Sequence, residues 1–388
     1  MNILIADAGR YYREKFGEPE CIVSSPGRIN LIGEHTDYNQ GWVMPAAIDN
    51  AVYVSAGRRS DQEIQVYAVN YDELLVADAS NLTKASPRWS DYVLGVVAVL
   101  QKHGYPVSGF QMVLRGDIPE GAGLSSSAAV ECAVLFALDH LFGWQIPRKT
   151  MALLAQEAEH SYAGVQCGIM DQFASLFGKQ DHLLQLDCRT MDFRYLPWDS
   201  NDVELLLFNT KVKHELASSE YNQRRLECEA GVALLKQYDP RIQSLRDVSP
   251  DIVEKVLSGA EKEIYQRCLY VTEEISRVEA AAIDLEKGDM EAFGKKMFAT
   301  HRGLRDLYQV SCPELDALVS WAQQDSFVLG ARMMGGGFGG CTINLVRKGA
   351  ASGVIDKFNE KYLEQFGCFL EAYPVKIMTG TTLVDIAV

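Results

Sequence analysis

The sequence lacks every pattern that would tie its cysteines together. Nine cysteines are scattered over 388 residues, and no two of them stand in a CxxC spacing. An odd, dispersed set argues against a disulfide framework and against a structural zinc site, and it is typical of a reducing compartment. We therefore expect a cytoplasmic protein with free thiols.

Long hydrophobic runs are also missing. No stretch of 18 apolar residues occurs, and the first residues lack the basic start and long apolar stretch of a signal peptide. We expect neither a membrane span nor a secretory leader. The length instead suits two domains that share or flank a cleft, with a substantial core.

Positive charge is in short supply. Lys and Arg number 37 against 52 Asp and Glu, which gives a net charge of −15. A surface of this sign repels nucleic acids and anionic membranes, so neither is an expected partner. If such a protein binds a polyanion, it needs local positive potential from helix N-termini, backbone amides, a few cations or a metal ion.

Several familiar catalytic motifs are absent. The glycine- and serine-rich stretch at 119–127 has no GK[ST] ending, so it is not a Walker A loop, and its glycines do not fit the dinucleotide fingerprint. No GxSxG elbow surrounds its serines, which argues against a serine hydrolase. His35 has no second histidine at the spacing of an HExxH zinc site, which excludes that reading.

Hydrophobic periodicity predicts an α+β protein with mixed sheets. In the first half we expect strands at Cys21–Ser25, Ala51–Arg58, Glu63–Val69, Glu73–Ala77, Gly109–Leu114, His182–Asp187 and Val203–Asn209, and helices at Trp89–His103, Ser127–Phe142 and Arg148–Tyr162. Later we expect helices at Ser218–Gln237, Tyr265–Lys287, Glu291–Leu307 and Ala350–Phe366, a hairpin of Phe327–Met334 with Cys341–Val346, and a strand at Phe369–Val375. A soft boundary near Asp192–Asn201 divides the chain into 1–195 and 196–388.

The strongest local signal is PEGAGLSSSAA at 119–129, between an expected strand and an expected helix. Glycines let the backbone turn tightly, and the helix start adds unpaired N–H donors and the positive dipole end. Serine hydroxyls add further donors and a hard oxygen ligand for Mg²⁺. The combination suits a phosphate cradle. The alternative is a helix N-cap whose serines only satisfy the free amides.

Two further segments concentrate polar chemistry. PGRINLIGEHTDYN, at 26–39, holds carboxylate, amide and hydroxyl groups that suit the hydroxyls of a sugar. The alternative is a polar turn with a satisfied histidine and a surface ion pair. CGIMDQFA, at 167–174, places the lone acid Asp171 near a helix start, either as an N-cap or as a carboxylate that orients a hydroxyl for attack on a γ-phosphate. A third, GGGFGG at 335–340, allows close backbone approach or forms a plain glycine hairpin.

Together these segments resemble the GHMP kinases, a family named for its galacto-, homoserine, mevalonate and phosphomevalonate members. All three family motifs are present in order, so the resemblance covers nearly the whole chain. Within the family, GRINLIGEHTDYN and AEHSYAGVQCGIMDQ are similar to the galactose-specific branch. The resemblance implies a ribosomal S5-like N-terminal domain, a ferredoxin-like C-terminal domain and an active site between them.

The resemblance also implies roles for single residues. Asp171 would act on the anomeric hydroxyl of the sugar, and Arg28 would pair with it and stabilise charge on the transferring phosphoryl group. Ser127 and Glu159 would hold Mg²⁺. Contacts to the sugar are expected from Glu34, His35, Asp37, Gly168, Asp171 and Tyr221. Contacts to ATP are expected from Gly121, Ala122, Gly123, Leu124, Ser125, Ser126, Ser127, Trp89 and Tyr92.

The expected activity is therefore ATP-dependent phosphorylation of D-galactose at the C1 hydroxyl, with Mg²⁺ as cofactor, giving galactose 1-phosphate and ADP as the first committed step of galactose catabolism. Two alternatives stay open: the same chemistry on N-acetylgalactosamine or arabinose, and a non-catalytic galactose sensor. The complete Leu124–Ala129 segment, together with Arg28 and Asp171, argues against a sensor. We expect a monomer or weak oligomer.

Overall fold

The computed structural model describes residues 3–82, 89–119, 121–198, 201–212 and 217–384, so Glu120 of the glycine–serine loop lies outside it. Its helices are α1 (Ile3–Phe16), α2 (Ser90–Lys102), α3 (Ser126–Phe142), α4 (Arg148–Ala158), α5 (Met170–Phe177), α6 (Ala217–Tyr238), α7 (Pro250–Leu257), α8 (Lys262–Glu286), α9 (Met290–Gly303), α10 (Pro313–Gln324) and α11 (Ala351–Phe366). Short helical turns are η1 (Asp37–Asn39), η2 (Glu159–Ala163), η3 (Leu245–Asp247) and η4 (Leu304–Tyr308). Its strands are β1 (Cys21–Asn30), β2 (Trp42–Val43), β3 (Pro45–Arg58), β4 (Glu63–Ala68), β5 (Glu73–Asp78), β6 (Phe110–Gly116), β7 (His182–Asp187), β8 (Phe193–Pro197), β9 (Val203–Asn209), β10 (Val328–Met333), β11 (Cys341–Arg347), β12 (Glu371–Val375) and β13 (Thr382–Leu383).

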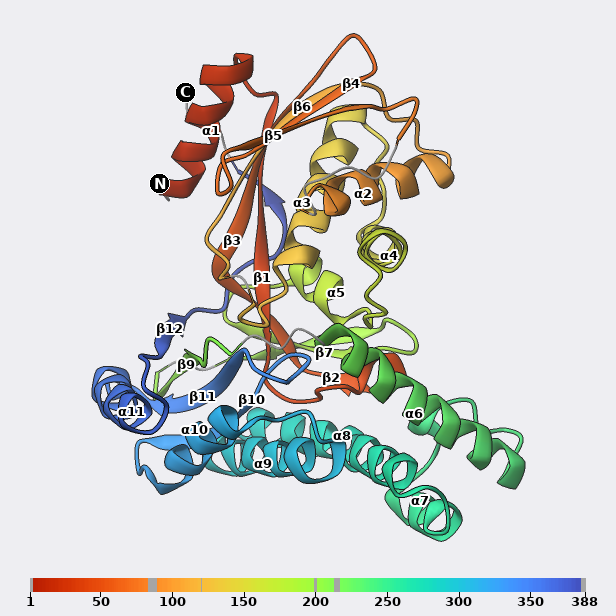
Figure 1. Cartoon of the computed structure of the whole chain (residues 1–388), viewed down its shortest axis with the longest axis vertical. Helices are drawn as coiled ribbons and strands as arrows, with labels where there is room; N and C mark the ends of the chain where they lie inside the picture. Colours follow the sequence, from red (N-terminus) through yellow and green to blue (C-terminus); the bar gives the residue numbers. More distant parts are fainter. Residues whose placement is uncertain (1–2, 83–88, 120, 199–200, 213–216, 385–388) are drawn as a thin grey trace.

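A six-stranded sheet in the order β13-β1-β3-β6-β4-β5 organises the first half of the chain. Its neighbours are antiparallel except β4 and β6, which run parallel. Helix α3 packs on β1 and β3 from one side, and α1 covers β3 and β6 from the other (Figure 1). Because both faces of the sheet are covered, β1 is apolar or buried along nearly its whole length and shows no clean alternation.

A four-stranded antiparallel sheet, β10-β11-β9-β12, organises the second half. Helices α9 and α10 pack on β10, and α8 packs on α9, α6 and α7 (Figure 1). The small sheet β2-β7-β8 contacts β3 on one side and α8 on the other. This third sheet therefore joins the two halves, and the halves pack closely.

Most of the expected elements are confirmed, including the β4–β5 pair and the β10–β11 hairpin. Strand β1 is longer than expected because a bulge between Pro26 and Arg28 lets it continue through the proline to Asn30. The helix expected to reach Tyr162 is α-helical only to Ala158 and continues as the π-helical turn η2. Such turns often mark functional sites.

The structure also bears on the expectations about cysteines, membrane spans and the domain boundary. All nine cysteines are free. Among the helices of the described residues, none is long and apolar enough to cross a membrane. The division at 195/196 stays a prediction, and the end of the chain crosses it: β13 returns to pair with β1, with Val23 opposite Leu383.

Candidate active site

Asp171 lies where α5 begins, at the centre of a group of donors. Arg28 of β1 donates to both of its oxygens, Nε to Oδ1 at 2.8 Å and Nη2 to Oδ2 at 3.0 Å, and Ser125 Oγ donates to Oδ2 at 2.5 Å. Ile169, not Asp171, occupies the N-cap position of α5, so the N-cap alternative for Asp171 is wrong. The planar fork of a buried arginine fixes this carboxylate in one orientation.

A cavity of about 320 Å³ opens beside this ion pair. It gathers side chains and backbone from all four segments singled out in the sequence. Of the predicted site residues, it is lined by Arg28, Glu34, His35, Asp37, Gly121, Gly123, Leu124, Ser125, Ser126, Ser127, Glu159, Asp171 and Tyr221. Ala122 is fully buried and does not line it, and Gly168 lines an adjoining cavity together with Asp37. The glycine cluster contributes Gly335 and Gly336.

The Asp37 carboxylate packs directly against the Cα atom of Gly168. A Cβ atom on Gly168 would lie 2.0 Å from Asp37 Oδ2, so a glycine is required for the carboxylate to take this place. Burial, and then the nearby charge of Asp171, raises the pKa of Asp37 to about 7. At neutral pH this carboxyl group therefore exchanges between an acceptor-only form and one that donates a proton.

His35 is held by aromatic neighbours. Its backbone is left-handed, with φ of 62°, and its Nδ1 shares a hydrogen bond of 2.8 Å with Tyr38, whose hydroxyl shares another of 2.7 Å with Tyr308. Burial, and then the charge of Arg224, lowers the pKa of His35 to about 3. The imidazole is therefore neutral at physiological pH. Its buried Nε2 has no hydrogen-bond partner within the described residues and remains available to a ligand.

The loop before α3 has the backbone that a phosphate cradle needs. Gly121, Gly123 and Ser125 have positive φ values of 70°, 73° and 59°, and α3 begins directly afterwards at Ser126. The Ser125 side chain makes no capping hydrogen bond to the helix, so the N-cap alternative does not account for it. Ser126 and Ser127, the first residues of α3, line the cavity, so the N-terminus of the helix, with its free amides and positive dipole end, lies at the cavity wall.

The glycine cluster forms the hairpin turn and also closes the site from the second half. A Cβ on Gly335 would lie 3.4 Å from Gly123 Cα, so two glycine loops meet with little space between their backbones. A Cβ on Gly337 would lie 2.2 Å from the carbonyl oxygen of Val310, and its φ is 89°. A side chain at Gly337 would clash with Val310, and at both positions the positive φ favours glycine.

Ser127 and Glu159 form a pair of hard oxygen ligands. Ser127 Oγ donates to Glu159 Oε1 at 2.9 Å, and Gln172 Nε2 donates to Oε2 at 2.7 Å. Burial, and then the charge of Asp171, raises the pKa of Glu159. In the described part of the chain, the hydrogen-bond partners of Glu159 are Ser127, Cys167 and Gln172, none of them cationic, and no three His, Cys, Asp or Glu side chains gather as a metal site. This donor set fits Mg²⁺, which takes one or two protein oxygens and fills its shell with water and phosphate.

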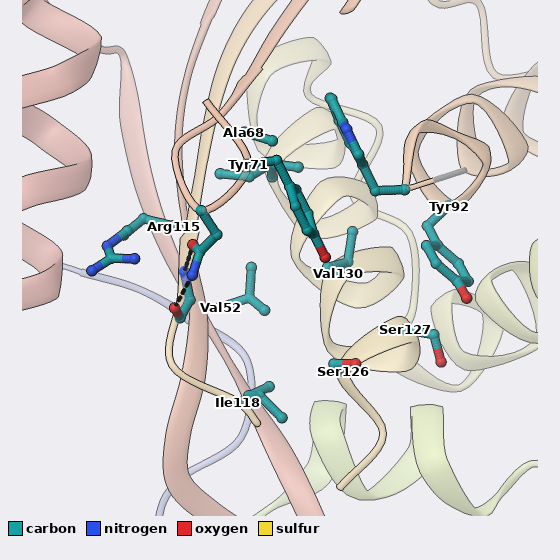
Figure 2. Close-up of a pocket in the computed structure, with 13 residues that line it drawn as sticks. Val52, Ala68, Tyr71, Tyr92, Arg115, Ile118, Ser126, Ser127 and Val130 are labelled. Atoms are coloured by element: carbon teal, nitrogen blue, oxygen red, sulfur yellow. Dashed lines mark hydrogen bonds between the residues drawn. The ribbon is translucent and has the colours of Figure 1, made fainter. Parts of the chain in front are cut away.

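A second pocket adjoins the first and is more apolar. Trp89 and Tyr92, predicted to lie near the nucleotide, line it together with Tyr71, whose ring stacks against Trp89 at 6.4 Å between centroids. Figure 2 shows Tyr71, Val130 of α3 and Tyr92 of α2, which line the same pocket. Ser126 and Ser127 line both pockets, so the pockets meet at the end of the glycine–serine loop and the start of α3.

Sequence reasoning missed Tyr71, which lines the apolar pocket, and two residues that support the polar one from behind, Tyr308 and Arg332. Tyr71 lies in the turn between β4 and β5, and nothing in its local sequence marks it. Tyr308 and Arg332 reach the site from η4 and β10 by long-range packing: Arg332 Nη1 donates to Glu34 Oε2 at 2.7 Å. Arg332 directly precedes the MMGGGFGG stretch, and that proximity is the one signal that could have found it.

Comparison with protein families matches three segments of the chain. Residues 10–58 match the galactokinase galactose-binding signature, which contains Arg28, Glu34, His35 and Asp37. Residues 91–179 match the GHMP kinases N terminal domain, and residues 281–364 match the GHMP kinases C terminal domain. The glycine–serine loop, Asp171 and the glycine cluster lie inside these last two matches.

Curated and solved relatives extend the match over the chain. It is 40% identical to a galactokinase from Thermotoga maritima, over 92% of this chain and 98% of that protein, and 42% identical to human galactokinase, over 92% of both. The structure of a Lactococcus lactis galactokinase in complex with galactose superposes with a TM-score of 0.94 at 34% identity, covering 98% of this chain and all of the other. A Methanococcus jannaschii mevalonate kinase, 19% identical, shares the fold with a TM-score of 0.65 over 94% of this chain. The chain belongs to the galactokinase family of GHMP kinases.

Proposed function

We propose that this protein transfers the γ-phosphoryl group of ATP to the C1 hydroxyl of D-galactose, giving galactose 1-phosphate and ADP. The observation that carries the proposal is the Arg28–Asp171 pair at the edge of a cavity that joins the polar 26–39 segment to the glycine–serine loop. Sugar and nucleotide phosphates would thus meet at one ion pair. Membership of the galactokinase family supports the sugar and the reaction.

The sugar would bind between the polar residues of the first half and Tyr221 of α6. Glu34 and Asp37 offer carboxylate oxygens, and His35 offers an unpartnered ring nitrogen, so the set both accepts and donates hydrogen bonds as sugar hydroxyls require. Gly168 would act indirectly, by leaving room for Asp37. These contacts would place the C1 hydroxyl at Asp171.

Asp171 would orient the C1 hydroxyl for in-line attack and accept its proton. Arg28 holds the carboxylate through two nitrogens and adds positive charge beside the transferring phosphoryl group. Phosphoryl transfer asks little covalent chemistry of a protein, so positioning and charge neutralisation supply most of the rate enhancement. The ion pair performs both.

ATP would lie across both pockets. The adenine would occupy the apolar pocket with Tyr71, Trp89 and Tyr92, and the phosphates would follow the backbone amides of the loop and the start of α3. Ser127 and Glu159 would hold Mg²⁺, which when bound neutralises phosphate charge. Local donors of this kind offset the net charge of −15.

The test is ADP release with MgATP and a panel of galactose, 2-deoxygalactose, N-acetylgalactosamine, arabinose, glucose and mevalonate. We expect fast turnover with galactose and little with glucose. Asp171→Asn serves as the matched negative control, because the substitution keeps the shape of the side chain. Faster turnover of N-acetylgalactosamine or arabinose than of galactose would replace the substrate, and galactose binding without turnover would favour a sensor.

A further inference from the structure

One arginine from the second half of the chain binds the segment Asn30–Glu34. This segment leads from β1 into the candidate sugar site. Arg332 of β10 is fully buried. Its Nη1 donates to Glu34 Oε2 at 2.7 Å, its Nε donates to the carbonyl oxygen of Leu31 at 2.9 Å, and its Nη2 donates to the carbonyl oxygen of Asn30. One side chain thus ties a carboxylate and two backbone carbonyls together.

Residues of helix α8 also hydrogen-bond to this segment. The hydroxyl of Tyr270, also fully buried, donates to the carbonyl oxygen of Glu34 at 3.0 Å. At the residue directly before Glu34, the amide of Gly33 donates to Glu274 Oε1 at 2.9 Å. The backbone on both sides of the Glu34 side chain is therefore held by residues that follow position 196.

Glu34 is bound by Arg332 through one carboxylate oxygen and also lines the cavity. Within the described residues its hydrogen bonds engage Oε2 only, and the residue lines the cavity beside Asp171. The Glu34 side chain has almost no exposure, so its direction depends on the groups that hold it. If the Glu34 carboxylate turned away from Arg332, it would lose its charge partner and its orientation in the cavity.

We propose that Arg332 and Tyr270 are positioning residues for the sugar, which act on galactose affinity through Glu34. The inference rests on the proposed function, because the orientation of the Glu34 carboxylate affects activity only when a sugar occupies the cavity. Arginine suits this position because its planar fork satisfies acceptors in several directions at once, whereas lysine offers a point charge on a flexible stem. Neither residue lines the apolar nucleotide pocket, so ATP should be affected little.

The first experiment compares two buried tyrosines that each donate to a backbone carbonyl. Tyr270→Phe removes the bond to Glu34, and Tyr362→Phe removes an equivalent bond of 2.9 Å to Thr210, which does not line the cavity. We expect Tyr270→Phe to raise the galactose KM about 3- to 10-fold and to leave the ATP KM within about twofold. Tyr362→Phe should lower the Tm about as much as Tyr270→Phe does, but it should leave the galactose KM unchanged.

The second experiment is a double-mutant cycle between Arg332→Lys and Glu34→Gln, with galactose affinity measured by calorimetry without ATP. We expect Arg332→Lys to weaken galactose binding about 10- to 100-fold in the natural background and far less in the Glu34→Gln background. Equal weakening in both backgrounds would show that Arg332 does not act through Glu34 and would overturn the proposal.

The outcomes separate this inference from the proposed function. If the unmodified protein does not phosphorylate galactose, the proposed function is wrong, and the inference that rests on it is overturned too. If the unmodified protein is active and Tyr270→Phe raises the galactose KM no more than Tyr362→Phe does, the function stands and the positioning role is overturned. The tyrosine comparison decides even if Arg332→Lys fails to fold, because each tyrosine variant loses only a hydroxyl.

Discussion

At the scale of single residues, Asp171 depends on donors that lie far apart in the chain. Arg28 and Ser125 are 143 and 46 residues away from it, and both donate to its carboxylate. Motif spacing could single out these three residues, but it could not show that they form one hydrogen-bonded group. Their contact is set by β1, α3 and α5 packing together, which no local pattern encodes.

Replacing either member of the ion pair should abolish most of the activity while the fold survives. We expect Asp171→Asn to lower kcat about 10²- to 10⁴-fold, because the amide cannot take the hydroxyl proton, and Arg28→Ala to lower it by at least about 10³-fold. Steady-state ADP release from protein with native circular dichroism measures both. Asp325→Asn, which removes the negative charge that pairs buried Asp325 with half-exposed Lys357, is the control and should leave kcat unchanged. Near-normal turnover by either site variant would remove that residue from the mechanism.

The raised pKa of Asp37 predicts a pH-dependent stability. Its pKa rises from 3.8 to about 7 on folding, so between about pH 4 and pH 7 the folded protein keeps a proton that the unfolded chain releases. The free energy of unfolding should therefore fall as pH rises through this window, by up to about 4 kcal/mol from this group. Urea unfolding at several pH values measures the free energy of unfolding of wild type and of Asp37→Asn. The difference between the two proteins should shrink as pH falls and Asp37 becomes neutral.

His35 supplies the control for that experiment. Its pKa falls to about 3 on folding, so the unfolded chain takes up a proton below about pH 6.5 that the folded protein refuses. Stability from this group is lost as pH falls, opposite to Asp37. His35→Gln should therefore remove this loss, so that the variant gains stability relative to wild type as pH falls from about 6.5 toward 3. Identical pH profiles for wild type and Asp37→Asn would contradict the burial of a protonated Asp37.

At the scale of elements, β10 is held against α9 by two glycines in contact. A Cβ on Gly294 would lie 2.1 Å from the carbonyl oxygen of Leu329, and one on Gly330 would lie 2.5 Å from Gly294 Cα. Periodicity predicted both elements, but it gave no reason for a glycine in the middle of a helix. The reason is the close approach of helix and strand, which in turn places Arg332 beneath the candidate sugar site.

Gly294→Ala should therefore destabilise the protein even though alanine favours helices. We expect a loss of about 1–3 kcal/mol or more, because the new methyl group forces α9 away from β10. Gly353→Ala is the matched control: it lies in helix α11 with nothing within 4 Å of its Cβ, and the same change should add about 0.5–1 kcal/mol. Urea midpoints measure both. Shifts of the same sign would contradict the packing argument.

At the scale of the whole molecule, the last described residues belong to the first sheet. Thr381 is fully buried, its hydroxyl donates to the carbonyl oxygen of Ser175 at 3.0 Å, and it shares a hydrogen bond of 2.8 Å with Ser25. Arg148 Nη2 donates to the carbonyl oxygen of Thr381 at 2.8 Å. The chain thus crosses to the second half and returns, which ties the two halves into one structure.

Removing this buried hydroxyl should cost stability without touching the chemistry. We expect Thr381→Val to lower the free energy of unfolding by about 1–3 kcal/mol, because it leaves buried polar partners unsatisfied, and to leave kcat unchanged. Thr382→Val, one residue further along in the exposed part of β13, should change it by less than about 0.5 kcal/mol. Thermal unfolding and ADP release together measure both effects. Equal stability of the two variants would show that the end of the chain is not tied in as described.

The sequence by itself determined the fold class, most elements and the family, because these depend on local periodicity and on motifs of contiguous residues. It also singled out Asp171, Arg28 and the glycine–serine loop. The family resemblance also implied that Arg28 pairs with Asp171, but only the tertiary structure decided the two-nitrogen geometry of that pair, the contact of buried Arg332 with Glu34, and the place of Tyr71 in the apolar pocket. Such contacts join residues up to 298 positions apart, and their geometry follows from how sheets and helices pack rather than from any short stretch of sequence.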